Sequence, residues 1–292
     1  MKVLIPNLHF YHFRNIAACL QTVGPKVNVK TFLWNVEVKP IIDAFDEVSP
    51  DLVFLHEGQL DSAFNMLCDE FDFDYVLVAS KEPVDVNKKP VAIITSTKFE
   101  SMFKNHSNVM SLLPAAKVTE IHAANQIEML ESEVLVITGV VPHTEAVVNS
   151  MRALAQSYRT KIIGEAPVSL PNYLGNVTMF ERADFIKSAK ILVDFGAYDY
   201  LDAAYLNTMP LFGQPPPAGL EKVKTFSNIP TLLSGIDSLL SKDGNSDEYS
   251  QDIHNDTIEN HTYYHRCAKV FDSIGMTETS EALLDFLKEL LK

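Results

Sequence analysis

The chain alternates short apolar runs with helical patterns, and this alternation constrains the fold more than any other feature. Extended apolar runs lie at Lys2–Pro6, Val27–Leu33 and Leu52–His56, with helical patterns between them at Phe13–Val23 and Pro40–Val48. A helical pattern and two more extended runs follow, at Asp61–Glu70, Tyr75–Ala79 and Val91–Ile94. Strands that alternate with helices pair in parallel, so this part of the chain predicts an α/β domain.

A second series of the same kind begins later in the chain. It has extended runs at Glu133–Gly139 and Lys161–Gly164, with a helical pattern at Thr144–Gln156 between them. The preceding stretch Pro114–Gln126 has no strong periodicity, which is typical of a connection between domains. We therefore expect an α/β fold of two Rossmann-like domains facing a cleft, formed by residues 1–125 and residues 126–292.

The composition predicts a folded, cytoplasmic protein. Hydrophobic residues make up 47% of the chain, and no apolar run approaches the roughly 20 residues of a membrane helix. The cysteines Cys19, Cys68 and Cys267 are far apart in apolar surroundings, which favours buried thiols over disulfides or a metal cluster. The net charge of −14 disfavours a broad nucleic-acid surface, because phosphate contacts need clustered Lys and Arg. We expect no membrane partner, and a monomer or a homodimer.

The most informative single stretch places two aspartates around a strand-to-helix junction. Asp194 ends the apolar run Ile191–Val193, and Gly196 permits a sharp turn. Asp202 then lies within a helical pattern at Tyr198–Leu206. In open α/β sheets, ligands bind beyond the carboxyl ends of strands, where helix N-termini favour anions. The stretch therefore predicts a ligand site.

The spacing of these aspartates, with seven residues between them, resembles the donor-sugar signature of GT-B glycosyltransferases. In that family the first acidic residue lies near the transferred sugar and the second holds the ribose hydroxyls, so the resemblance implies these roles for Asp194 and Asp202. Both are usually Glu, and Asn207 stands where the family normally has Gly. The run Asp202–Pro210, which adds Thr208 to the implied donor site, is also similar to one in the DNA α-glucosyltransferases of T-even phages.

The resemblance implies a nucleotide sugar, above all a UDP-sugar, as co-substrate, with no metal and no further cofactor. Gly164 and Glu165 follow a strand at the position where the family binds the nucleobase. Many members bind the diphosphate with an Arg and a Lys after the first strand of the second domain, and the run Thr138–Thr144 has neither. The groups left for this task are backbone amides, at the turn of Gly196, Ala197 and Tyr198 and at the helix start near Thr144, together with the side-chain cations Arg182, Lys187 and Lys190.

Candidates for a general base lie in the first domain. His9 and His12 follow the first strand, and Glu57 follows the strand that ends near His56, so each could take a proton from an acceptor hydroxyl. An inverting reaction needs such a base, whereas a retaining one can use the leaving phosphate; the sequence does not choose between them. The pair in Asp72–Asp74 precedes a strand instead of following one, so we interpret it as a loop and not a metal site.

Three segments complete the C-terminal part. Lys242–Ser250 is polar and rich in turn formers, which predicts a loop. Asn260–Arg266 leads into a helix and resembles a segment near the end of the CgeB-type glycosyltransferase-like family. Ser280–Lys292 has apolar residues on one face and predicts a helix that packs on this chain.

The sequence thus predicts a glycosyltransferase that moves a sugar from a nucleotide sugar to an acceptor it does not identify. Modified, hydroxymethylated phage DNA stays open as the acceptor because of the phage-like run, although the net charge opposes it. Two alternatives also stay open. One is an epimerase or hydrolase of nucleotide sugars on the same scaffold, and the other is a non-catalytic protein that binds a nucleotide or nucleotide sugar.

Overall fold

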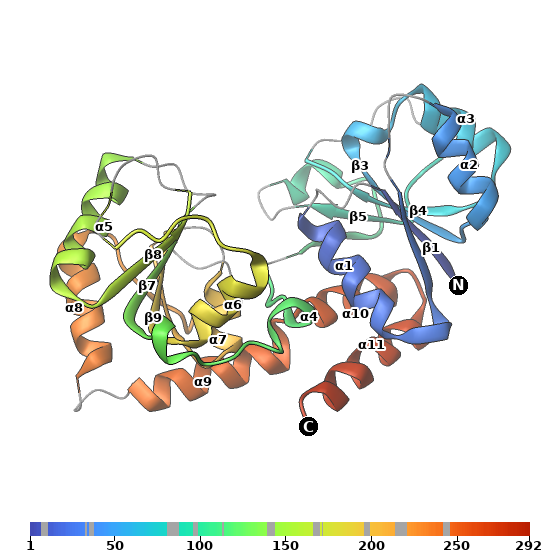
Figure 1. Cartoon of the computed structure of the whole chain (residues 1–292). Coiled ribbons are helices and arrows are strands. Elements are labelled where there is room, and N and C mark those ends of the chain that lie inside the picture. The colour runs from blue at the N-terminus through green and yellow to red at the C-terminus, as the bar shows by residue number, and fades with distance from the viewer. Residues whose placement is uncertain are drawn as a thin grey trace. The chain divides into compact units, whose positions relative to one another are not determined.

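The chain forms two compact units, shown in Figure 1. Unit 1 comprises Met1–Leu113 and Tyr263–Lys292, and unit 2 comprises Pro114–Thr262. The structure is a computed structural model, and it describes all residues except 7–10, 33, 35–37, 81–87, 96–98, 113, 139–143, 166–169, 171, 196–198, 214–220 and 242–245, and except the side chains of 6, 11, 12, 25, 38 and 62. Each unit contains a parallel sheet with interleaved helices, which confirms the prediction of two Rossmann-like α/β domains.

The sheet of unit 1 has six parallel strands in the order β2-β1-β3-β4-β5-β6. The strands are β1 (Lys2–Pro6), β2 (Asn28–Phe32), β3 (Leu52–His56), β4 (Asp74–Val78), β5 (Ala92–Thr95) and β6 (Val109–Ser111). The strand order reverses at β1, which pairs with β2 on one side and with β3 on the other. In open α/β sheets, ligands bind beyond the carboxyl ends of the strands at such a reversal.

Helices from both ends of the chain pack in unit 1. They are α1 (Tyr11–Thr22), α2 (Val38–Val48), α3 (Ser62–Glu70), α10 (Tyr263–Ser273) and α11 (Thr277–Leu290), with short 3₁₀ helices η1 (Gly24–Lys26), η2 (Glu57–Gln59) and η3 (Glu100–Phe103). Helix α1 packs against α10 and α11 (Figure 1). The Tyr264 hydroxyl of α10 donates to Thr22 Oγ1 at 3.1 Å, and the rings of Phe271 and Phe54 are in contact. The last helices therefore belong to the N-terminal unit.

The sheet of unit 2 has five parallel strands in the order β11-β10-β9-β7-β8. The strands are β7 (Ser132–Thr138), β8 (Thr160–Gly164), β9 (Ala189–Asp194), β10 (Met209–Phe212) and β11 (Lys224–Thr225). Strand β7 pairs with β8 on one side and β9 on the other, so the order reverses between β7 and β9. The ligand position expected from this topology lies beyond Thr138 and Asp194, the last residues of these two strands.

In the part of unit 2 that the structure describes, six α-helices accompany these strands, and three of them begin with a side-chain cap. They are α4 (Val118–Ile121), α5 (Glu145–Ser157), α6 (Met179–Lys187), α7 (Tyr200–Tyr205), α8 (Ile229–Leu240) and α9 (Ser246–Asn260), with the 3₁₀ helix η4 (Glu128–Leu130). Thr144, Thr178 and Asn228 accept hydrogen bonds from first-turn amides of α5, α6 and α8, which satisfies groups that have no partner within a helix. These caps fix where each helix leaves the carboxyl edge of the sheet.

The structure differs from the sequence expectations in three places. The loop expected at Lys242–Ser250 is wrong in its second half, because α9 already begins at Ser246. The division between units falls at Pro114, inside the expected connection, but Tyr263–Lys292 returns to unit 1 instead of staying with residues 126–292. Strands β6 and β11 and helices α6 and α8 had no counterpart in the expectations.

Two further findings concern the chain as a whole. Cys19, Cys68 and Cys267 are free thiols, and Cys19 and Cys267 are buried, as expected. Among the helices that the structure describes, none has the length and apolar character needed to cross a membrane.

Candidate functional site

The candidate site lies at the carboxyl edge of the sheet of unit 2, where β9 leads into α7. Asp194 ends β9, and its Oδ2 accepts hydrogen bonds from the backbone N–H groups of Asp199 at 2.7 Å and Tyr200 at 3.0 Å. The residue is only 2% exposed. Amides at the start of a helix have no partner within it, so this carboxylate joins the end of β9 to the start of α7.

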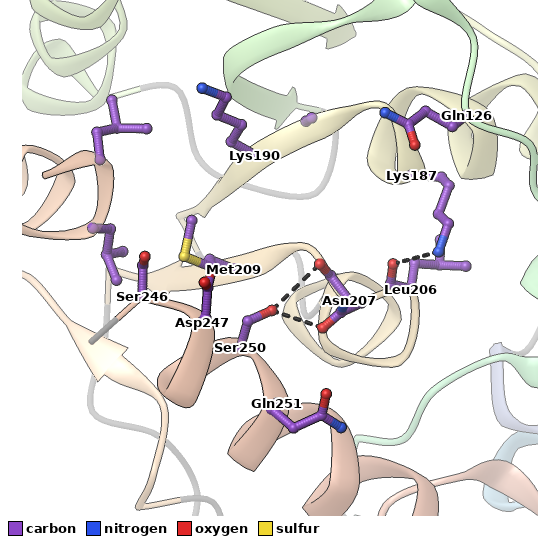
Figure 2. Close-up of a pocket in the computed structure, with 13 residues that line it drawn as sticks. Gln126, Lys187, Lys190, Leu206, Asn207, Met209, Ser246, Asp247, Ser250 and Gln251 are labelled. Atoms are coloured by element: carbon purple, nitrogen blue, oxygen red, sulfur yellow. Dashed lines mark hydrogen bonds between the residues drawn. The ribbon is translucent and has the colours of Figure 1, made fainter. Parts of the chain in front are cut away.

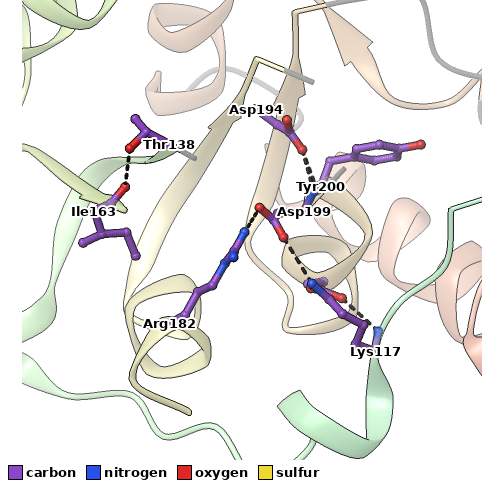
Figure 3. A network of polar contacts seen from close by, with 8 residues as sticks. Lys117, Thr138, Ile163, Arg182, Asp194, Asp199 and Tyr200 are labelled. Carbon is purple, nitrogen blue, oxygen red and sulfur yellow. Dashed lines mark hydrogen bonds and ion pairs between the residues drawn. The ribbon is translucent and has the colours of Figure 1, made fainter. Parts of the chain in front are cut away.

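A buried network of ion pairs lies beside the start of α7 (Figure 3). The Lys117 ammonium lies 2.5 Å from Asp202 Oδ2 and 3.2 Å from Asp199 Oδ1. The backbone N–H of Lys117 donates to Asp202 Oδ1 at 2.9 Å, and Arg182 pairs with the second carboxylate oxygen of Asp199. The side chains of Lys117, Asp199 and Asp202 are 8%, 3% and 2% exposed. Both oxygens of Asp202 are thus engaged by one residue that lies far away in sequence.

Burial is the largest influence on the Asp202 carboxyl and raises its pKa. Lys117 opposes this effect, and the neighbouring Asp199 carboxylate adds to it. The ion pair with Lys117 therefore compensates a charge that this environment otherwise disfavours. Each Asp202 oxygen keeps a lone pair, but the side chain is only 2% exposed, so a ribose hydroxyl reaches it only after a local rearrangement.

Two of the predicted donor-site residues lie at the same edge. Gly164 ends β8 with φ +101°, a conformation that favours glycine, and a Cβ there would lie 2.1 Å from the carbonyl oxygen of Thr138. Thr138 Oγ1 donates to the Ile163 carbonyl at 3.1 Å, which links the ends of β7 and β8. Glu165 follows Gly164 and is exposed. The backbone conformation and the close approach of Thr138 therefore explain why residue 164 is a glycine, and the side chain of Glu165 is accessible to a ligand.

Thr208 and two of the expected cations lie at the opposite edge of the sheet. Helix α7 runs back from the end of β9, so Thr208 immediately precedes β10 and its hydroxyl donates to the Ile186 carbonyl at 2.7 Å. Lys187 ends α6 and Lys190 lies near the start of β9. Arg182, in contrast, lies in the first part of α6, near the carboxyl edge. The chain direction thus separates Arg182 from the two lysines.

The structure leaves part of the expected site undescribed. Gly196, Ala197 and Tyr198, and likewise His9, lie outside the described residues. His12 lies within α1, and its side chain is outside the description. The roles expected for these residues stay predictions.

In unit 1, Glu57 and His56 lie where β3 ends, next to the reversal of the strand order. Glu57 accepts hydrogen bonds from the backbone N–H of Ser80 at 2.6 Å and from its hydroxyl at 2.8 Å, so its carboxylate ties the end of β3 to the end of β4. His56 lines a cavity of about 200 Å³ together with Val78, Ala79, Ser80, Ile94, Thr95, Phe99 and Leu112. The structure thus places a histidine, and not the predicted glutamate, at the wall of this cavity.

The hydrogen bonds of His56 determine what its imidazole can do. Nδ1 accepts a hydrogen bond from the Gly58 backbone N–H at 3.2 Å, so the neutral ring carries its proton on Nε2. Burial lowers the pKa of His56 from its ordinary value of 6.5, and the nearby Glu57 carboxylate opposes this effect only in part. His56 is therefore neutral at pH 7 and suited to donate a hydrogen bond rather than to take a proton.

Sequence reasoning found Asp194 and Asp202 but not their partners. Lys117 lies in the stretch Pro114–Gln126 that has no periodic pattern, and it meets Asp202 only through the fold, so no local signal points to it. Among the described residues, no group of three or more His, Cys, Asp and Glu side chains is placed to hold a metal ion.

Comparison with known proteins identifies the fold. No protein-family model matches the chain, and no curated protein matches it significantly. The sucrose-phosphate synthase of Thermosynechococcus elongatus matches with a TM-score of 0.64 and 8% identity, over 93% of this chain and 98% of that chain. The spinosyn forosaminyltransferase SpnP matches with a TM-score of 0.58 and 11% identity, over 94% of this chain and 99% of that chain.

A structure with another activity in its name matches with a slightly lower TM-score. The UDP-GlcNAc 2-epimerase of Neisseria meningitidis, bound to UDP-GlcNAc, has a TM-score of 0.56 and 10% identity, over 99% of this chain and 100% of that chain. At such low identities these likenesses establish the fold alone, which is the GT-B type that the donor-like spacing led us to expect.

Proposed function

We propose that the chain is a glycosyltransferase that takes a sugar from a nucleotide sugar, a UDP-sugar, and transfers it to an acceptor. The observation that carries the proposal is the spacing of Asp194 and Asp202 together with their place at the strand-to-helix junction beside the β7/β9 reversal. The likeness of nearly the whole chain to a forosaminyltransferase and to a sucrose-phosphate synthase supports it.

The proposal places the donor beyond the carboxyl ends of β7, β8 and β9. Asp194 acts by fixing the start of α7, through the two amides that it accepts. Arg182 supplies planar N–H donors near this edge for the diphosphate, on condition that its pairing with Asp199 leaves some of them accessible. Contact between Asp202 and a ribose hydroxyl requires a local rearrangement that exposes the carboxylate, because its side chain is 2% exposed and packed against Lys117.

The proposal places the acceptor at the carboxyl edge of unit 1, beyond β3, β4 and β5. The cavity beside His56 has a largely apolar wall, on which carbon atoms of an acceptor can pack. Glu57 serves as a base only if it gives up its hydrogen bonds to Ser80, which leaves His9 and His12 as the other proposed bases. Modified DNA has no further support, and the net charge of −14 opposes it.

A nucleotide-sugar epimerase is the second candidate, because the matching Neisseria structure carries that activity in its name. The same fold hosts both chemistries, so the distinction must come from products and not from the likeness. A third reading, a protein that binds a nucleotide sugar without turnover, is favoured by the missing Arg and Lys after β7.

Incubation of the protein with single UDP-sugars, followed by proton and phosphorus NMR, separates these candidates. A glycosyltransferase releases UDP when an acceptor is present, whereas a hydrolase releases UDP without one. An epimerase yields a second UDP-sugar and no UDP. Arg182→Gln tests the proposed contact of Arg182 with the diphosphate and should lower product formation. Lys104→Gln, which changes an exposed residue of unit 1, is the matched control and should leave product formation unchanged. Binding of UDP-sugars without any product in the presence of a broad acceptor panel would contradict the proposed transfer.

A further inference from the structure

A cavity of about 570 Å³ opens at the amino-terminal edge of the sheet of unit 2 (Figure 2). It lies between the starts of β9 and β10, the turn after α7, the end of α8 and the start of α9. Its lining residues include Lys187, Lys190, Asn207, Asp247, Ser250 and Gln251. Small-molecule sites commonly have volumes of about 300–1,000 Å³. The size of this cavity is therefore that of a binding site for a metabolite.

The wall formed by the turn after α7 is fixed from two sides. Lys187 Nζ donates to the Leu206 carbonyl at 3.0 Å, and Ser250 Oγ donates to Asn207 Oδ1 at 2.8 Å (Figure 2). Asn207 has φ +62°, a conformation that Asn tolerates better than most residues. The Tyr249 hydroxyl donates to the Pro210 carbonyl at 2.6 Å, which holds α9 against β10. The polar groups of this wall are thus positioned before any ligand arrives.

The charges of the lining favour an anion. Lys187 and Lys190 provide two ammonium groups, and Asp247 provides one carboxylate. An ammonium group has three N–H donors, and Lys187 donates one of them to the Leu206 carbonyl. Lys190 is exposed and forms no hydrogen bond or ion pair with any residue that the structure describes. Charge-assisted hydrogen bonds to phosphate oxygens are among the stronger polar contacts in proteins.

The remaining lining groups suit hydroxyl groups of a ligand. Ser246, Ser250, Asn207 and Gln251 carry hydroxyl or amide side chains, which both donate and accept hydrogen bonds. Met209 and Leu239 add an apolar floor on which carbon atoms can pack. Lys187 and Lys190 lie at different sides of the cavity (Figure 2), so one ammonium group beside neutral polar groups matches a ligand that joins one anionic group to a short hydroxylated chain.

We propose that this cavity is a second ligand site, which binds a small phosphate monoester of a polyol or sugar. The site differs from the donor site, because Lys190 and Asp194 lie four residues apart along β9, about 13 Å at the rise of an extended strand. The proposal does not rest on the proposed function, since it uses residues of the opposite edge only.

Isothermal titration calorimetry with glycerol 3-phosphate and ribose 5-phosphate tests the site. Glycerol and ribose probe the hydroxylated part of the ligand alone, and inorganic phosphate probes the anionic part alone. Each titration is repeated with UDP present in excess, so that a phosphate group binding at the donor edge is displaced. We expect saturable binding of the phosphate monoesters that UDP does not abolish, no binding of the uncharged compounds, and weaker binding of inorganic phosphate.

Charge variants identify the location. Lys190→Glu should weaken binding at least tenfold, and Asp247→Asn should strengthen it, because the first reverses a favourable charge and the second removes an unfavourable one. Lys104→Glu, an exposed lysine of unit 1, is the matched control and should leave the affinity unchanged. The proposal is overturned if neither phosphate monoester binds, if UDP abolishes binding, or if Lys190→Glu stays within twofold of the parent.

Discussion

Replacing Lys117 with Met should destabilise unit 2 by about 3–5 kcal/mol, the cost of removing one partner of a buried ion pair. Its ammonium lies 2.5 Å from Asp202 and 3.2 Å from Asp199, and all three side chains are at most 8% exposed. Met keeps most of the apolar stem, so the loss comes from charge rather than from volume. Asp199 retains Arg182, whereas among the described residues Asp202 retains only the backbone N–H of residue 117. The unpaired charge therefore falls mainly on Asp202.

The assay is hydrogen exchange with mass spectrometry across a urea series, read on peptides from β7 and β9. A chain of two units need not unfold in one step, so peptides from β3 and β4 of unit 1 report that unit separately. Lys288→Met is the matched control. Its ion pair with Asp285, at 3.1 Å between side chains that are 70% and 72% exposed, should contribute less than about 1 kcal/mol.

Two further readouts make the reasoning refutable. In the Lys117→Met background, Asp202→Asn removes the unpaired charge and should recover a large part of the lost stability. An unpaired Asp202 has a folded-state pKa above its unfolded value, so the folded state binds more protons and the defect should shrink as the pH falls through the folded-state pKa towards the unfolded value of about 4. A loss below about 1 kcal/mol, or a double variant no more stable than the single one, would refute the account of this network.

Further predictions concern a glycine and a histidine. Gly164→Ala should cost more than about 2 kcal/mol, because the new Cβ meets the Thr138 carbonyl at 2.1 Å and the residue has φ +101°. Gly275→Ala, at φ +77° with nothing within 4 Å, should lose only the conformational part, about 1–2 kcal/mol, and equal losses in urea unfolding would contradict the clash. The pKa of His56, followed by NMR, should lie below 6.5. Because the folded state then binds fewer protons, its contribution to stability should be lost as the pH falls through about 6.5, and His56→Gln should remove this dependence.

The strands of the sheets could be predicted because a fully buried strand is a short, continuous run of apolar residues. Such a run can be recognised from neighbouring residues alone. The expected runs Lys2–Pro6 and Leu52–His56 coincide with β1 and β3, whose residues from Val3 to Ile5 and from Leu52 to Leu55 are fully buried. Helix α9 escaped prediction because it is polar on most of its surface and buries only Ile253 and Thr257. Without an apolar stripe, turn formers before Ser246 dominated the local signal.

The domain boundaries show a second limit of sequence reasoning. The apolar face of Ser280–Lys292 predicted a helix that packs on this chain, and Leu283 and Leu287 of α11 are indeed buried. The apolar pattern indicates that one face of this helix is buried, but it does not indicate which element of the chain covers that face. Helix α11 packs on its neighbour α10 and on α1, which lies at the other end of the chain, and only the fold assigns α10 and α11 to unit 1.

The candidate site could be found in part because its spacing is local. Asp194 and Asp202 lie on one continuous stretch, so their place at a strand-to-helix junction follows from the apolar run before them. The cations of the network, Lys117 beside Asp202 and Arg182 beside Asp199, come from other elements and carry no pattern of their own. The direction of α7, which carries Thr208 to the far edge, also follows only from the topology.

The central claim is that the carboxyl edge of unit 2 binds a nucleotide sugar. The most direct test is a thermal-shift screen with UDP, GDP, ADP, CMP and their common sugar conjugates, because a ligand of the folded state alone must raise the melting temperature. Hydrogen exchange with the best ligand then locates the contact. The account predicts a rise with a uridine diphosphate conjugate and new protection in the peptides that end β7, β8 and β9. No shift with any nucleotide, or protection confined to other segments, would contradict it.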